Sequence, residues 1–141
     1  MYDLIALQKQ IFFNLCCVLI LYVALGSAFG GVVRYLIITE ISRVFGDVFP
    51  WSTLAVNLTG SFLLGLIIGA ISTQFLSSPA YYFGVVGFSG GLTTFSSFSL
   101  QNLSLASQRR WWAVAWNILG SISLCMICIL GGYLIGEGTL F

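Results

Sequence analysis

The sequence predicts an all-α membrane protein, a single domain of residues 1–141 with four transmembrane helices. Two observations lead to this fold class. Hydrophobic residues make up 59% of the 141 residues and charged residues only 6%, so a water-soluble domain would lack the polar side chains that cover a surface. The chain also contains long apolar runs joined by short connectors, and each run supplies the ~20 residues that a helix needs to cross a bilayer.

The predicted spans follow these runs in order. The first covers residues 12–38, and the others cover residues 51–72, 81–105 and 111–136. Aromatic residues fall near the span ends, where amphipathic rings prefer the headgroup level: Tyr35, Trp51, Tyr81, Tyr82, Trp111, Trp112 and Tyr133. These positions support the boundaries. The four spans together predict a multi-pass protein of the cell membrane that contacts the lipid bilayer.

The first run has a second interpretation as a cleaved signal peptide. Lys9 precedes an apolar core, and the stretch ALGSA offers small residues for cleavage. However, the apolar run continues past any such cleavage point. A mature chain of three spans would also lose part of the small-residue pattern described below, so a retained first span is favoured.

The basic residues predict only a weak orientation. Lys9 lies on the side of the termini, whereas Arg43, Arg109 and Arg110 lie on the other side, with Arg34 near the end of its helix. The rule that Lys and Arg stay cytoplasmic weakly places the termini outside. Because the bias is small, insertion in both directions is a working hypothesis.

Acidic groups are missing from the predicted span interiors. Asp3 and Asp47 lie outside the apolar runs, while Glu40 and Glu137 lie at or beyond span ends. Proton-coupled transporters keep an ionisable group inside the membrane, and a nucleophilic serine needs a base. The chain has no histidine, so the sequence argues against a proton-coupled exporter and predicts that the protein is not an enzyme.

The four cysteines all lie in predicted spans: Cys16, Cys17, Cys125 and Cys128. Without a histidine, a tetrahedral zinc site has little support. We interpret these cysteines as small apolar packing residues.

The second span carries one helical face of small and polar residues: Thr53, Asn57, Gly60, Ser61, Leu64 and Gly65. Glycines spaced by four occur here and in two other spans, as Gly65 with Gly69, Gly26 with Gly30, and Gly132 with Gly136. Such pairs let helix backbones approach closely. Asn57 differs, because an amide in hydrocarbon costs a few kcal/mol unless it is hydrogen-bonded. It needs an interhelical partner or a wet pathway.

The third span contains the weakest helical segment, since Gly90 and Gly91 are followed by Thr93 and Thr94. We expect the third helix to be broken there, near mid-membrane. Irregular backbone at that depth must be satisfied by protein or water, and unwound carbonyls are a recurrent way to hold a small cation.

Beyond the expected break, Phe95 and Phe98 lie three apart, with Ser96 and Ser99 on a neighbouring face. Aromatic ring edges are partially positive, so they can stabilise an anion without a formal charge, and hydroxyls add ordinary donors. This pattern is typical of a path for a small anion. Simple core packing of the rings and back-bonding of the serines to their own helix remain the alternatives.

At these residues the sequence closely resembles the Fluc family of fluoride channels, also known as CrcB proteins. The stretches GGVVRY, STLAVNLTGSFLLG and GFSGGLTTFSSFS carry the resemblance, in that order, in the first three spans. The resemblance implies a channel that exports fluoride ion passively from the cytoplasm across the cell inner membrane and relieves fluoride toxicity. It also implies an antiparallel dual-topology homodimer with two pores at the dimer interface, a central structural Na+ and no nucleic-acid partner.

Transferred by motif position, the resemblance assigns roles to several residues. Phe95, Phe98 and Asn57 would line the fluoride pore, and Ser96 would belong to its polar track. The carbonyls of Gly90 and Thr93 would bind the Na+.

Other positions match the family less fully. Arg34 matches an arginine that would anchor a helix end or shape the vestibule potential. In the fourth span, many members have a tyrosine four residues before a serine, whereas this chain has Asn117 four residues before Ser121. The resemblance would place Asn117 and Ser121 in the fluoride pore, with an asparagine where many members have the tyrosine. The leader, residues 1–10, is longer than usual in the family.

Two other functions stay open. A small four-helix exporter of another solute would need a gradient-coupled carrier group, and a non-transporting structural membrane protein would carry no flux. Independently of the resemblance, four helices of this length enclose too little space for a lined pore, so we expect a dimer.

Overall fold

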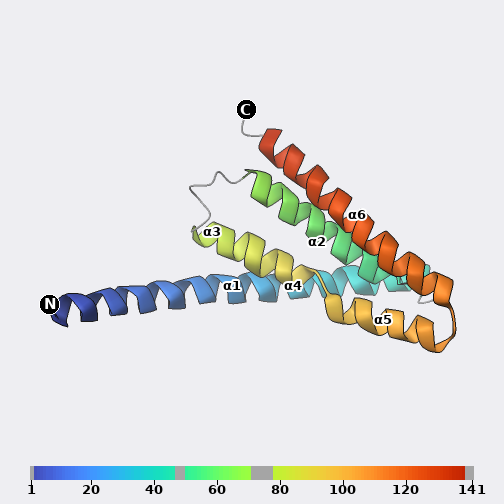
Figure 1. The fold of residues 1–141 in the computed structure, drawn as a ribbon, viewed down its shortest axis with the longest axis horizontal. Helices are drawn as coiled ribbons and strands as arrows, with labels where there is room; N and C mark the ends of the chain where they lie inside the picture. The colour runs from blue at the N-terminus through green and yellow to red at the C-terminus, as the bar shows by residue number, and fades with distance from the viewer. Residues whose placement is uncertain (1, 47–49, 71–77, 139–141) are drawn as a thin grey trace.

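The computed structural model describes residues 2–46, 50–70 and 78–138, and within these ranges it is helical with no strands (Figure 1). The predicted all-α class is therefore confirmed. In chain order the elements are α1 (Tyr2–Phe45), α2 (Trp51–Ala70), α3 (Pro79–Tyr81), the π-helix η2 (Tyr82–Ser89), α4 (Gly90–Leu92), α5 (Phe95–Ser107) and α6 (Trp111–Gly138).

Three of the helices are long and apolar enough to span a membrane. They cover Phe12–Phe45, Trp51–Ala70 and Trp111–Gly138. The first extends beyond the predicted end at residue 38, and the predicted end of the second span, residues 71–72, lies outside the described residues. The third predicted span, residues 81–105, is instead divided among α3, η2, α4 and α5, each too short to cross alone.

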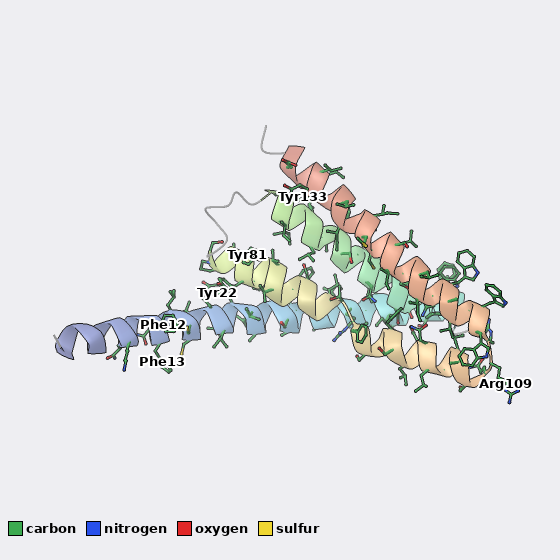
Figure 2. The ribbon with its side chains drawn as sticks, viewed as in Figure 1. Phe12, Phe13, Tyr22, Tyr81, Arg109 and Tyr133 are labelled. Carbon is green, nitrogen blue, oxygen red and sulfur yellow. The ribbon has the colours of Figure 1, made fainter. Side chains whose placement is uncertain are left out.

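α1 is much longer than a bilayer is thick. Its 44 residues correspond to a rise of about 66 Å, and its N-terminal part projects well beyond the other helices (Figure 1). Phe12 and Phe13 lie on this projecting part and are 69% and 67% exposed (Figure 2). We refer to this projecting N-terminal part of α1, which includes Phe12 and Phe13, as the α1 arm.

The core inside the described chain is small. Its buried hydrophobic residues are Val56, Val85, Leu92 and Leu105. The remaining large apolar side chains are mostly outward-facing, as expected for helices whose solvent is lipid. Close helix contact must therefore come from small residues rather than from interlocking large ones.

Glycines place α2 and α6 in backbone contact. A Cβ at Gly65 would collide with the carbonyl oxygen of Ile129, and one at Gly132 would collide with that of Phe62. Gly69 and Gly136 have equivalent neighbours one turn further on. The GxxxG interpretation of these two pairs is confirmed, and α2 and α6 lie side by side along their length (Figure 1).

A second close contact joins α1 to η2 and α4. A Cβ at Gly26 or Gly30 would strike the backbone of the 83–92 region, and one at Gly91 would strike Ser27. The Gly26–Gly30 pair is thus also a contact between backbones. The fold consists of two tightly joined helix pairs, one made by α2 and α6 and one by α1 and the 79–92 segment.

The close contact between α2 and α6 can be tested by adding a single Cβ atom. Gly65→Ala adds a Cβ against the backbone carbonyl of Ile129, which cannot move aside as a side chain can. We expect the variant to lose about 1–3 kcal/mol of stability and to unfold at lower temperature in detergent. Gly120→Ala is the matched control on α6, because a Cβ there meets nothing within 4 Å. Equal unfolding temperatures for the two variants would contradict the close contact.

The segment after α3 departs from regular α-helix. η2 has π-helical hydrogen bonding, and the Ser89 hydroxyl donates to the Gly84 carbonyl at 3.1 Å. The chain then forms the single turn α4. Thr93 and Thr94 are extended, with φ, ψ of −74°, 157° and −145°, 120°, and α5 begins displaced from the line of α4 (Figure 1). Gly90 itself keeps helical angles, so the two threonines are the non-helical residues.

Candidate functional site

An open groove of about 460 Å³ lies between α2, α6 and the start of α5. We call it the central groove. None of its lining residues is charged. They are Asn57, Ser61, Leu64, Thr93, Thr94, Phe95, Phe98, Ser121, Ile122, Cys125, Met126 and Ile129.

Asn57 holds the extended segment with both ends of its amide. The Thr94 N–H donates to Asn57 Oδ1 at 2.8 Å, and Asn57 Nδ2 donates to the Thr94 carbonyl at 3.2 Å. Thr94 is 6% exposed, so these bonds satisfy a backbone that would otherwise be buried without partners. The partner that the sequence required for Asn57 is therefore the backbone at the helix interruption.

The Thr94 side chain starts the next helix. Its hydroxyl accepts the N–H of Ser97 at 3.3 Å as the N-cap of α5. It also lies 3.2 Å from the hydroxyls of Ser96 and Ser97. Three hydroxyl groups are thus gathered beside the groove, each able to turn its hydrogen toward a different acceptor.

The two phenylalanines come from the first turn of α5. Phe95 is 79% exposed, and its ring centroid lies 5.9 Å from that of Phe98 at an interplanar angle of 42°. Both rings line the central groove. An apolar ring this exposed packs little against its own chain, so it is available to a second surface.

The carbonyls expected to bind Na+ lie at the helix interruption. In a continuous helix the Thr94 N–H would return to the Gly90 oxygen, but here it donates to Asn57. Gly90 is exposed, and a Cβ there would meet nothing within 4 Å. The Thr93 carbonyl accepts one hydrogen bond, from Arg34 Nη1 at 3.1 Å. Oxygens of this kind retain lone pairs and fit a hard cation.

Arg34 therefore binds the extended segment from the α1 side. Its guanidinium reaches the carbonyl that precedes the one held by Asn57. It does not line the central groove.

Asn117 and Ser121 form a buried pair on α6. They are 2% and 7% exposed, and the Ser121 hydroxyl donates to Asn117 Oδ1 at 3.4 Å. Ser121 lines the groove, whereas Asn117 lies behind it and donates from Nδ2 to Asn102 Oδ1 at 3.0 Å. Sequence reasoning missed Asn102. The signal that identified Asn57, an amide in an apolar span that needs a partner, applied equally to it.

The predicted site residues thus divide into two groups. Five of them lie together on the groove wall: Asn57, Thr93, Phe95, Phe98 and Ser121. The others lie next to the wall rather than on it. Ser96 is exposed at the start of α5, and Gly90, Arg34 and Asn117 do not line the groove. The four cysteines are free thiols, and Cys125 lines the groove.

Comparison with known proteins places this sequence in a family. The family model described as CrcB-like protein, Camphor Resistance (CrcB) matches residues 21–133. Similar proteins include the fluoride-specific ion channel FluC of Paramagnetospirillum magneticum, 43% identical over 114 residues that cover 79% of this chain and 89% of the relative. The protein of the same name from Hahella chejuensis is 45% identical over 114 residues, 80% of this chain and 90% of the relative.

A third relative, fluoride-specific ion channel FluC 2 of Bradyrhizobium diazoefficiens, is 39% identical over 123 residues, 84% of this chain and 89% of the relative. These relatives are named as ion channels, so the prediction that the chain is not an enzyme is confirmed. The match covers every residue that lines the groove and every candidate site residue. The chain therefore belongs to the CrcB family, as the resemblance of its first three spans to the Fluc channels indicated.

Proposed function

We propose that the protein is a fluoride-selective channel that lets fluoride leave the cytoplasm down its gradient and so relieves fluoride toxicity. Its site of action would be the cell inner membrane. One observation carries the proposal: an uncharged groove in which an asparagine-braced backbone segment lies beside two phenylalanine rings. The names of the relatives supply the ion.

An uncharged groove suits a small, strongly hydrated anion. A selective path must replace the water around fluoride with donors, but a fixed cation in the path would trap the ion. The hydroxyls on the groove wall and the Asn57 amide, with the ring edges of Phe95 and Phe98, supply partial positive charge without that trap. Arg34 is occupied with the Thr93 carbonyl and lies off the wall, which leaves the path neutral.

A second, oppositely inserted copy would complete the path. Phe95 is 79% exposed, and the groove is open along one side. Closing it against another copy would shield the ring and enclose a conduit that one chain leaves open. By symmetry such an antiparallel homodimer would hold two pores at its interface.

In this arrangement the interruption at Thr93 and Thr94 would lie near mid-membrane. The exposed Gly90 would then face its counterpart, and the Gly90 and Thr93 carbonyls of both copies would hold a structural Na+. The ion would supply positive charge that holds these oxygens together across the interface.

Fluoride efflux from liposomes that contain the purified protein tests the proposal. We expect rapid, electrically measurable fluoride flux without a proton gradient and with little chloride current. Flux that requires a proton gradient or carries another solute would identify an exporter of a different class. No flux from folded protein would leave a structural role.

The assembly has separate tests. Cross-linking in detergent should trap dimers, and reporter fusions at the C-terminus should find both insertion orientations. Monomers alone, or a single orientation, would overturn the antiparallel arrangement.

A further inference from the structure

A chain of three hydrogen bonds links α6 to the backbone of α5. Ser121 donates to Asn117, Asn117 Nδ2 donates to Asn102 Oδ1 at 3.0 Å, and Asn102 Nδ2 donates to the Phe98 carbonyl at 2.9 Å. Every link donates in the same direction, so each bond polarises the next. The chain begins on the groove wall at Ser121 and ends on the residue that carries a groove ring.

The turn between α5 and α6 brings the two asparagines together. Arg109 adopts positive φ, 57°, and the Arg110 N–H closes the end of α5 on the Leu105 carbonyl at 3.0 Å. This tight turn lies at the far end of the molecule, where Figure 2 labels Arg109. Asn102 and Asn117 are 15 positions apart on its two sides, and the hydrogen bond between them places them at one height.

Asn102 and Asn117 each have one partner on α5 and one on α6, and Asn102 is the one that belongs to α5. α5 has one buried residue, Leu105, and lacks the glycine contacts that fix α2 on α6. Apolar packing therefore constrains α5 weakly. The Phe98 carbonyl also accepts the N–H four residues on in an α-helix, so the Asn102 amide adds a second donor to the same turn.

We propose that Asn102 is a positioning residue for permeation, an inference that rests on the proposed channel function. It transmits the fixed position of the buried Asn117–Ser121 pair to the turn of α5 that carries Phe98. Phe95 follows, because its ring packs on that of Phe98. Asn102 thus sets the spacing between the ring wall and the α6 wall of the central groove without lining the groove itself.

The test compares Asn102→Leu with Ser107→Ala. Ser107 is an exposed residue of α5 whose hydroxyl bonds only its own helix, at the Ser104 carbonyl, so its loss does not touch α6. In single-channel recordings we expect Asn102→Leu to reduce fluoride conductance several-fold and Ser107→Ala to leave it unchanged. Amide hydrogen exchange in residues 95–102 should accelerate by about tenfold in Asn102→Leu, from the loss of two hydrogen bonds.

Asn117→Leu, alone and combined with Asn102→Leu, completes a double-mutant cycle. Because both residues act through one hydrogen bond, the fluoride conductance of the double variant should be no lower than that of Asn102→Leu alone. Unchanged conductance in Asn102→Leu, or multiplicative effects of the two changes, would overturn the role in permeation. Unchanged exchange in α5 would overturn the positioning role whatever the flux. A parent protein without flux would instead refute the channel, and the exchange result would still decide whether Asn102 fixes α5.

Discussion

Replacing Asn57 with leucine is expected to abolish fluoride flux and to destabilise the protein strongly. The change removes both partners of the Thr94 backbone, whose N–H and carbonyl are buried. Each orphaned group costs about 1–3 kcal/mol, so the variant should lose roughly 2–6 kcal/mol. Thermal unfolding in detergent measures the stability, and liposome efflux per folded protein measures the flux.

The matched control is Thr59→Val on the same helix. Thr59 is exposed, and its hydroxyl bonds only the Ala55 carbonyl one turn back, at 2.8 Å. We expect this variant to keep the unfolding temperature and the flux of the parent. An Asn57→Leu protein that behaved like the control would show that the amide does not brace the interruption.

Replacing Phe95 or Phe98 with isoleucine is expected to lower fluoride flux by about a hundredfold or more, in line with the loss of several kcal/mol of ion stabilisation. Isoleucine keeps an apolar side chain but has no ring edge to face an anion. Phe95 is 79% exposed within one chain, so its loss should change the stability of that chain little. A ring that contacts the ion should affect flux without affecting stability, whereas a ring that only packs should affect stability.

Phe12→Ile is the control for this experiment. Phe12 is 69% exposed on the α1 arm, far from the central groove (Figure 2). The fluoride flux of the Phe12→Ile variant should equal that of the parent protein. Parent-like flux in both Phe95→Ile and Phe98→Ile would remove the rings from the permeation path and leave them as packing residues.

Sequence reasoning was most successful where a residue had a strong local requirement. A buried amide needs a partner, so Asn57 was identified, although only the fold could show that its partner is the Thr94 backbone. The glycine pairs were identified because close contact between helices in lipid needs small residues. The double-glycine, double-threonine stretch was identified as a weak helix former, and within it Thr93 and Thr94 have extended backbone angles.

The features that sequence reasoning missed depend on contacts between distant segments. The π-helix η2 lies where Gly26 and Gly30 of α1 meet its backbone, a constraint that no local pattern in residues 82–89 encodes. The pairing of Asn102 with Asn117 depends on the turn at Arg109, which uses the left-handed region usually taken by glycine. Neither the turn nor the shared height of the asparagines follows from helical periodicity.

The length of α1 has a consequence for handling the protein. A helix of 44 residues could lie wholly within a hydrocarbon layer of ~30 Å only by tilting roughly 60° from the membrane normal, far beyond the ~20° average for spanning helices. Part of the helix must therefore emerge into headgroups or water, and the exposed Lys9 and Gln10 favour the N-terminal end. A fluorophore or affinity handle attached there would sit outside the hydrocarbon and away from the conducting region, so labelling could report on sidedness without disturbing transport.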